Sequence, residues 1–266
     1  MPHSVINAIN IHYRDQGNSD RRVLVLIHGL GCSLQYWDCL FNAAALSHSR
    51  ILAIDLPGFG FSEKPEHYDY QLPSQSRLIF DILQRLQIRT FDLVGHSMGG
   101  TIAILMALQK PQRVRRLVTI EPNLLATHAQ LSRRIAQYTE DAFIDAYEEF
   151  RLSVINTVKG WFVKLRQQHV NDYISHLSRT TAISMYRSAR SLLQETSEPG
   201  LAGALKHIAL PRSLILGEES VQMRSSTIPE ELRDSSVDTI VVPGVGHMMM
   251  VDNPDLFTHT VAQALQ

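Results

Sequence analysis

Cysteine is scarce in this chain of 266 residues, which contains only Cys32 and Cys39. The two cysteines stand seven positions apart, and no metal-ligand spacing accompanies them. Such a low content excludes a disulfide-rich scaffold, and free thiols are the expected state. We therefore expect no metal site built on cysteine, and no other pattern of metal ligands suggests one.

An excess of charge of one sign and a long apolar run are also absent. The chain has 25 Lys and Arg against 26 Asp and Glu, a net charge of −1. This balance gives no electrostatic reason to expect nucleic acid or an anionic membrane as a partner. No apolar run approaches the roughly 20 residues of a membrane-spanning helix, and residues 1–7 lack the basic and apolar regions of a signal peptide. We expect a cytoplasmic protein.

Apolar material is plentiful, at 44% of residues. Short apolar runs without alternation recur along the chain, as is typical of strands buried on both faces of a parallel sheet. Helix-like stretches separate several of them, so the sequence predicts an α/β fold with helices covering a mostly parallel sheet. The strand-like runs are 22–27, 51–54, 91–94, 117–120, 214–216 and 239–242, and the clearest helix-like stretches are 74–87 and 99–110.

This alternation stops between residues 124 and 205, where no strand-like run occurs. Segments of helical periodicity begin near Glu140 and cover roughly 161–176 and 178–195, before a break at Glu198-Pro199-Gly200. The sequence therefore predicts an α/β core of residues 1–123 and 206–266, with a helical cap or lid inserted at 124–205.

The most informative motif is Gly95-His96-Ser97-Met98-Gly99, which reads G-x-S-x-G. An apolar run of strand type precedes it, and a buried helix follows. A serine placed between such elements sits on a sharp turn that exposes its hydroxyl. Ser97 is therefore the candidate nucleophile.

A serine hydroxyl needs a base to take its proton. Among 12 histidines, His247 has a distinctive context. It follows the last strand-like run through Pro243-Gly244-Val245-Gly246, and α/β sheets place functional groups in loops at the carboxyl ends of their strands. We assign His247 as the base, and we interpret His96 as a packing or turn residue.

Acyl transfer also needs hydrogen-bond donors for the oxyanion. The residue after the nucleophile, Met98, is expected to give one backbone N–H. The loop His28-Gly29-Leu30-Gly31 follows an early strand, and its glycines would let the Leu30 N–H face the site. An ordinary glycine turn, with His28 bonding locally, is the alternative.

Together these residues resemble the esterase/lipase-like α/β-hydrolase superfamily over essentially the whole chain. The resemblance implies an eight-stranded, mostly parallel sheet, a helical cap after the sixth strand, and a Ser–acid–His triad in that order. It rests on His28-Gly29-Leu30-Gly31 with Trp37 downstream, on Asp55-Leu56-Pro57-Gly58-Phe59-Gly60-Phe61-Ser62, on Gly95–Gly99 and on Gly246-His247.

The triad acid departs from the family pattern. It normally follows the seventh strand, three residues beyond a glycine, and Ser220 stands there in this chain. A serine cannot stabilise the imidazolium that forms on His247. Glu121 directly follows the run 117–120, where some branches of the superfamily carry a glutamate acid. We assign Glu121 as the acid, with Glu219 as the alternative.

These residues predict a cofactor-independent serine hydrolase that cleaves an ester, thioester or lactone through an acyl-enzyme on Ser97. A carbon–carbon bond hydrolase or a cofactor-free haloperoxidase of the same fold is an alternative. A second alternative is a small-molecule sensor with little turnover, which the missing aspartate at position 220 favours.

The substrate is expected to carry an apolar acyl or aromatic group. The adaptable methionines Met248, Met249 and Met250 follow the base, and aromatic residues are frequent in the cap segment. The candidate substrate-binding residues are Gly29, Phe143, Tyr147, Trp161 and Met248, with Phe150 and Phe162 as further aromatic residues of the cap.

Overall fold

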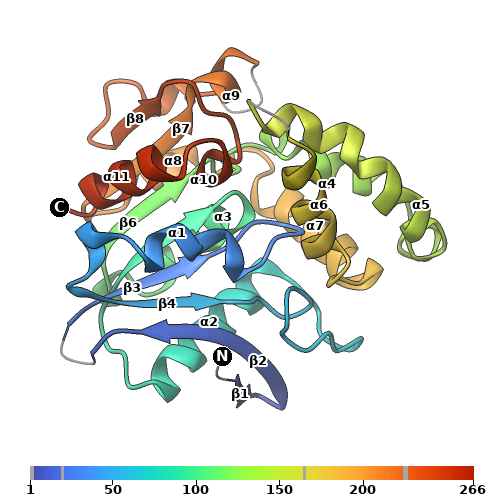
Figure 1. The fold of residues 1–266 in the computed structure, drawn as a ribbon, viewed down its shortest axis with the longest axis horizontal. Coiled ribbons are helices and arrows are strands. Elements are labelled where there is room, and N and C mark those ends of the chain that lie inside the picture. Colours follow the sequence, from blue (N-terminus) through green and yellow to red (C-terminus); the bar gives the residue numbers. More distant parts are fainter. Residues whose placement is uncertain (1–2, 19–20, 164–165, 224–226) are drawn as a thin grey trace.

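Eight strands form a single sheet in the order β1-β2-β4-β3-β5-β6-β7-β8 (Figure 1). The computed structural model describes residues 3–18, 21–163, 166–223 and 227–266. β1 and β2 pair antiparallel, β2 pairs antiparallel with β4, and the remaining neighbours are parallel. The predicted mostly parallel α/β sheet is therefore confirmed. The strands are β1 His3–Ile6, β2 Ile9–Gln16, β3 Arg22–Ile27, β4 Ser49–Ile54, β5 Phe91–His96, β6 Val114–Ile120, β7 Arg212–Gly217 and β8 Asp238–Val242.

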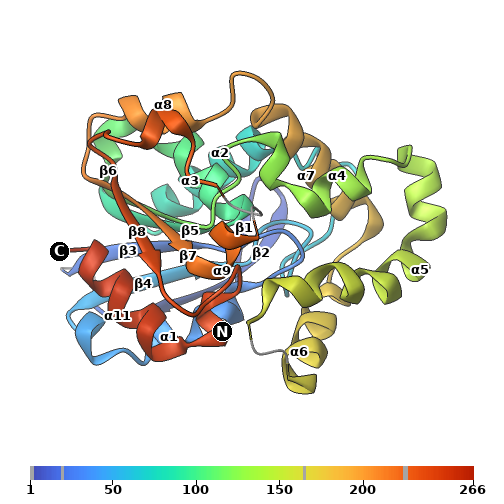
Figure 2. The ribbon, with the colours of Figure 1, turned by 90° about the horizontal axis from the view of Figure 1, so that it is seen from above.

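Helices cover both faces of this sheet. Figure 2 shows α2, α3 and α8 on one face and α1 and α11 on the other. Two short helices, α9 and α10, follow β7 and β8 in the chain. The bounds of these helices are α1 Asp38–Phe41, α2 Leu72–Arg85, α3 Met98–Gln109, α8 Ala202–His207, α9 Glu218–Gln222, α10 Met249–Asp252 and α11 Pro254–Ala264.

The burial of the elements explains why their sequences are so apolar. Residues 23–27 of β3 are all buried, as expected for a central strand with a helical layer on each face. Helix α3 is buried from Met98 to Ala107, because it packs on β5 and β6. Helix α2 buries one apolar stripe and exposes the other side, so it shows ordinary amphipathic spacing.

The strands β1 and β2 form a hairpin that the apolar runs do not reveal. Asn7 and Ala8 join them, and both have positive φ, at 51° and 65°. This backbone matches the right-handed twist of the paired strands. The strands themselves mix polar and apolar residues, since β1 lies at the edge of the sheet and three of its four residues are not buried.

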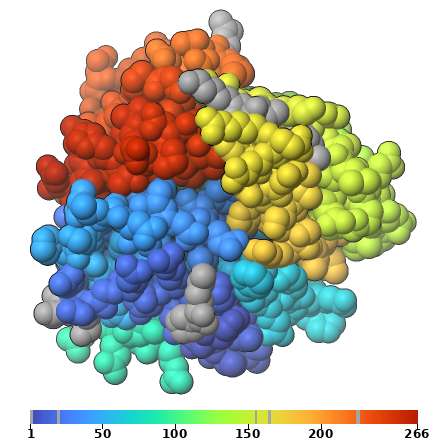
Figure 3. All heavy atoms as spheres, viewed as in Figure 1, coloured from blue at the N-terminus to red at the C-terminus, as the bar shows by residue number. Residues whose placement is uncertain are grey.

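Between β6 and β7, the described part of the chain contains helices and turns but no strand. Helices α4–α7 gather beyond one end of the sheet (Figures 1 and 2), and the space-filling view shows them in contact with both the blue and the red parts of the core (Figure 3). The division into core and cap stays a prediction, although α8 begins inside the range 124–205 and lies on the sheet. The helices beyond the sheet are α4 Gln130–Ile135, α5 Glu140–Val158, α6 Gln167–Leu177 and α7 Ala182–Glu195.

Three serines of α7 attach it to the loop and helix that follow β4. Ser184 Oγ donates to the carbonyl of Gly58 at 3.0 Å. One and two turns later, Ser188 Oγ accepts from Gln75 Nε2, and Ser191 Oγ accepts from the Leu72 N–H. The spacing places the three hydroxyls on one face of the helix.

Among the described helices, none is long and apolar enough to cross a membrane.

Candidate active site

Ser97 lies in the sharp turn between β5 and α3. Its φ of 53° and ψ of −122° are strained for a residue with a side chain. The turn brings helix and strand so close that a Cβ on Gly95 would lie 2.2 Å from the Gly99 carbonyl oxygen. A Cβ on Gly99 would lie equally close to the Ile27 oxygen. The small residues of the motif are therefore required by the packing, and the predicted strand–turn–helix context is confirmed.

His247 and Glu121 meet at the carboxyl end of the sheet. Glu121 directly follows β6, is 1% exposed, and lies with its Oε2 3.2 Å from His247 Nδ1. Its other oxygen accepts a hydrogen bond of 2.6 Å from the Gly217 N–H, at the end of β7. The carboxylate is thus held between a backbone donor and the imidazole. This geometry fixes the ring so that Nδ1 carries the proton and Nε2 is the basic nitrogen.

Glu219 occupies a different place. It lies in the first turn of α9, and its backbone N–H donates to the Val245 carbonyl at 3.2 Å. Ser220, at the family's usual aspartate position, is buried in the same helix. Among the described residues, Glu121 supplies the carboxylate that contacts His247. The geometry favours Glu121 over Glu219 as the acid.

His96 has a contact that the sequence did not indicate. It is buried as expected, but its Nε2 lies 2.9 Å from the backbone carbonyl of His247. Burial, followed by the neighbouring His247, holds the pKa of His96 well below its ordinary value. His96 is therefore neutral, and its Nε2–H donates to that carbonyl. His96, next to Ser97, thus holds the backbone of the candidate base.

The loop after β3 lies against Ser97. A Cβ on Gly29 would approach Ser97 Cβ to 3.0 Å, which explains the glycine. His28 anchors the loop, since its Nδ1 donates to the Gly29 carbonyl and its Nε2 accepts from the Leu56 N–H. The backbone N–H groups of Leu30 and Met98 make no hydrogen bond within the described part of the chain. Leu30 also lines the cavity beside Ser97, whereas Met98 is fully buried.

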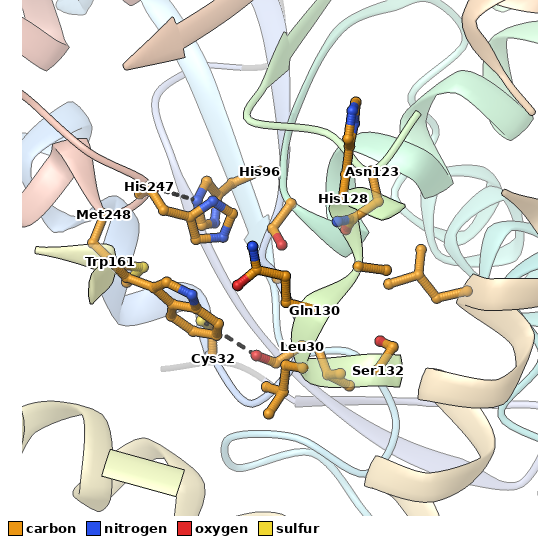
Figure 4. Close-up of a pocket in the computed structure, with 15 residues that line it drawn as sticks. Leu30, Cys32, His96, Asn123, His128, Gln130, Ser132, Trp161, His247 and Met248 are labelled. Atoms are coloured by element: carbon orange, nitrogen blue, oxygen red, sulfur yellow. Dashed lines mark hydrogen bonds between the residues drawn. The ribbon is translucent and has the colours of Figure 1, made fainter. Parts of the chain in front are cut away.

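A cavity opens beside Ser97 and His247 (Figure 4). It has about 40 Å³ of space for water-sized molecules, whereas one water needs roughly 10–15 Å³. Trp161 and Met248 lie on the side of His247, and Asn123 and His128 lie opposite. The lining residues are Gly29, Leu30, Cys32, His96, Ser97, Asn123, His128, Ala129, Gln130, Leu131, Ser132, Trp161, Leu192, His247 and Met248.

Three predicted substrate-binding residues, Gly29, Trp161 and Met248, line this cavity. The Trp161 ring lies 5.0 Å from the His247 ring, and the Met248 N–H donates to the Trp161 carbonyl at 3.1 Å. The opposite wall was missed, because its residues belong to the segment that leads from β6 into the cap. No local motif marks Asn123, His128, Gln130 and Ser132 as cavity residues.

Phe143 and Tyr147 do not line this cavity, so the structure does not bring them together with Gly29, Trp161 and Met248. Phe143 is fully buried in an aromatic cluster with Tyr147, Phe150 and Tyr186. The Tyr147 hydroxyl bonds to Thr180 Oγ1. Their helical spacing on α5 correctly indicated a buried face. That face packs among the helices beyond the sheet rather than lining the cavity beside Ser97.

The described residues contain no group of three or more histidine, cysteine or acidic side chains that could hold a metal ion. Cys32 is buried against the cavity, and burial raises its pKa to about 12. Its thiol therefore stays protonated and is not a second nucleophile at neutral pH.

Comparison with known proteins agrees with this architecture. The chain is 35% identical over 115 residues to the uncharacterised hydrolase YugF of Bacillus subtilis, covering 43% of this chain and 42% of that protein. It is 37% identical over 111 residues to the 2-hydroxy-6-oxo-2,4-heptadienoate hydrolase of Pseudomonas putida, covering 41% of this chain and 39% of that protein. The match thus spans about two-fifths of the length of each of these relatives.

Similarity to solved structures extends further along the chain. The enol-lactonase from Burkholderia xenovorans superimposes with a TM-score of 0.75 at 20% identity, covering 99% of both chains. At that identity the likeness shows the fold alone. The family model described as the alpha/beta hydrolase fold matches residues 22–254. With this match over most of its length, the chain belongs to the alpha/beta hydrolase fold family.

Proposed function

We propose that this hydrolase cleaves a carboxylic ester, thioester or lactone through an acyl-enzyme on Ser97. The observation that carries the proposal is the contact of 3.2 Å between Glu121 Oε2 and His247 Nδ1, beside a cavity that also contains Ser97. A buried carboxylate on one imidazole nitrogen leaves the other nitrogen to act as a base toward the serine.

The reaction begins when Ser97 Oγ attacks the substrate carbonyl carbon and His247 Nε2 takes the hydroxyl proton. The negative charge of Glu121 stabilises the imidazolium that results. Ser97 Oγ has no hydrogen bond to the described residues, as is common before substrate aligns the catalytic groups. Substrate binding in the cavity would supply that alignment.

The developing oxyanion accepts hydrogen bonds from the Leu30 and Met98 N–H groups. The tetrahedral intermediate then breaks its bond to the leaving group, which receives the proton from His247. Water, deprotonated by the same nitrogen, attacks the acyl-enzyme and releases the acid. Ser97 recovers its proton, so the cycle needs no cofactor.

The cavity bounds the size of the substrate group that lies beside Ser97. Its volume of about 40 Å³ fits a group of a few heavy atoms beside Ser97. Trp161, Leu192 and Met248 give it apolar surface, in keeping with an apolar or aromatic group. Larger substrates would require the cap helices to move.

A panel of phenyl esters, acyl thioesters and five- and six-membered lactones tests the proposal. We expect turnover of short acyl members by the wild-type protein and none above background by Ser97→Ala. Equal turnover by the two proteins would contradict the acyl-enzyme mechanism. Loss of turnover in both His247→Ala and Glu121→Ala, with the fold retained, would support it.

Carbon–carbon bond hydrolysis is the second candidate. The relative of Pseudomonas putida is named as a hydrolase of 2-hydroxy-6-oxo-2,4-heptadienoate, which favours this reaction. Adding a vinylogous 1,5-diketone to the panel discriminates the two. Cleavage of the diketone in preference to every ester would replace our proposal with this one.

A further inference from the structure

The cavity wall opposite Trp161 contains two buried polar atoms without a partner. Asn123 is 5% exposed and His128 is 8% exposed, and both line the cavity that contains Ser97. Within the described part of the chain, Asn123 Oδ1 and His128 Nδ1 have no hydrogen-bond partner. Figure 4 shows the two side chains together on this wall, across the cavity from His247.

Both residues are held in place by other atoms. The Asn123 carbonyl accepts from Thr101 Oγ1 at 3.1 Å, which fixes its backbone to α3. His128 Nε2 lies 2.9 Å from Thr227 Oγ1 and makes a hydrogen bond with it. The other ring nitrogen, Nδ1, makes no hydrogen bond with the described residues. The first contact fixes the backbone of Asn123, and the second orients the ring of His128.

Unpaired polar atoms in such positions are unusual in folded proteins. Most buried polar atoms have a partner, because leaving a donor or acceptor unpaired costs free energy. Here the two open atoms lie in the cavity where a substrate would bind. A substrate group that bonds to them would recover that free energy, whereas a plain hydrocarbon group would not.

The absence of a positive charge on this wall restricts which substrate group can bind to Asn123 and His128. Within the described residues, no lysine or arginine lines the cavity. Burial lowers the pKa of His128, which keeps its ring neutral at pH 7. With the carboxylate of Glu121 behind His247, an anionic group has no charged partner here.

We propose that Asn123 and His128 recognise a neutral hydrogen-bonding group, a hydroxyl or an amide N–H, on the substrate bound beside Ser97. Asn123 Oδ1 accepts from that group. His128 Nδ1 either accepts from it or donates to its oxygen, depending on the direction of the bond to Thr227. A hydroxyl can donate its hydrogen to Asn123 Oδ1 in either case, and its oxygen also accepts when His128 Nδ1 donates, so hydroxylated substrates are the class to test.

This inference rests on the proposed function and refines its substrate class. It adds a polar group to the expected apolar or aromatic one, since the apolar surface of Trp161, Leu192 and Met248 accounts for only part of the lining. Gln130 and Ser132, which also line the cavity, extend the polar wall.

Matched substrate pairs test the inference. The pairs are phenyl butyrate with phenyl 3-hydroxybutyrate, and γ-butyrolactone with its 2-hydroxy derivative. We expect the wild-type protein to prefer the hydroxylated member of at least one pair by roughly tenfold or more in kcat/KM. Asn123→Leu and His128→Phe should reduce that ratio toward one, whereas Asn171→Leu, an exposed change on α6, should leave it unchanged.

The possible failures are distinguishable. Turnover of both members at equal rates, or a preference that persists in Asn123→Leu and His128→Phe, would overturn this inference while leaving the serine hydrolase intact. If no substrate is cleaved, binding of 3-hydroxybutanamide and butanamide to Ser97→Ala is measured by calorimetry. Tighter binding of the hydroxylated amide, lost in the Asn123→Leu background, would support the recognition site. Equal or undetectable binding of both amides would overturn it.

Discussion

Glu121 and His247 are 126 positions apart in the chain, yet Glu121 Oε2 lies 3.2 Å from His247 Nδ1. The Gly217 N–H fixes the other carboxylate oxygen, so the glutamate connects the ends of β6 and β7 to the loop after β8. This arrangement is the basis for our proposal that Glu121, at the end of β6, is the acid that orients His247.

Glu121→Gln should lower kcat on the order of 10⁴-fold, because the amide cannot stabilise the imidazolium and can favour the wrong tautomer of His247. The measurement is the rate of hydrolysis of a short p-nitrophenyl ester. Glu219→Gln is the matched control and should change the rate little. Loss of activity in Glu219→Gln alone would show that our choice of acid is wrong.

Gly29→Ala should lower kcat/KM by roughly 10-fold to 100-fold, because small displacements of catalytic groups are costly. The added Cβ would lie 3.0 Å from Ser97 Cβ and 3.2 Å from His96 Nδ1, so the loop carrying Leu30 must move. The control is Gly203→Ala in α8, where a Cβ meets nothing within 4 Å. Equal activity in the two variants would show that the loop is not part of the site.

Ser191→Ala should lower the free energy of unfolding by about 1–3 kcal/mol. The Ser191 hydroxyl accepts from the buried N–H of Leu72 at 2.9 Å, and alanine leaves that donor unpaired between α7 and α2. Urea unfolding measures the change. Ser175→Ala, at an exposed position of α6, should stay within about 0.5 kcal/mol of the wild type.

Acid should destabilise the protein through buried neutral histidines. Burial, with smaller effects of Arg179 and His28, lowers the pKa of His176 from 6.5 to about 4. Between these values the unfolded chain binds more protons than the folded one, so stability falls as pH falls from 6.5 toward 4. For this group the slope is at most about 1.4 kcal/mol per pH unit.

His176→Gln should flatten that pH dependence by about 1 kcal/mol per pH unit, as measured by urea unfolding between pH 7 and 5. The same substitution at the exposed His67 should keep the wild-type slope. A His176→Gln protein with an unchanged slope would contradict this assignment.

Much of the site could be predicted because its signals are local. Ser97 lies in a five-residue motif whose small residues the packing requires, and His247 follows a glycine-containing loop after the last strand. Glu121 was indicated by its place at the end of a strand. The hairpin β1–β2 was not located, because its residues do not form a continuous apolar run.

The cavity walls were harder to predict, because they depend on how the cap lies over the sheet. Helical spacing showed that Phe143 and Tyr147 are buried, but it could not show that they contact each other rather than a substrate. Conversely, Asn123 and His128 have no motif around them. Only the fold shows that Asn123 Oδ1 and His128 Nδ1 lack a hydrogen bond to the described residues and that both residues line the same cavity as Ser97.

The central claim is that Ser97 is a nucleophile activated by His247. Its most direct test is reaction with a fluorophosphonate probe, followed by mass spectrometry of the peptide that carries the adduct. We predict one adduct on Ser97 in the wild-type protein, much slower labelling of His247→Ala, and none at this site in Ser97→Ala. A folded wild-type protein that binds a small ligand but leaves Ser97 unlabelled would contradict the account and favour a sensor with little turnover.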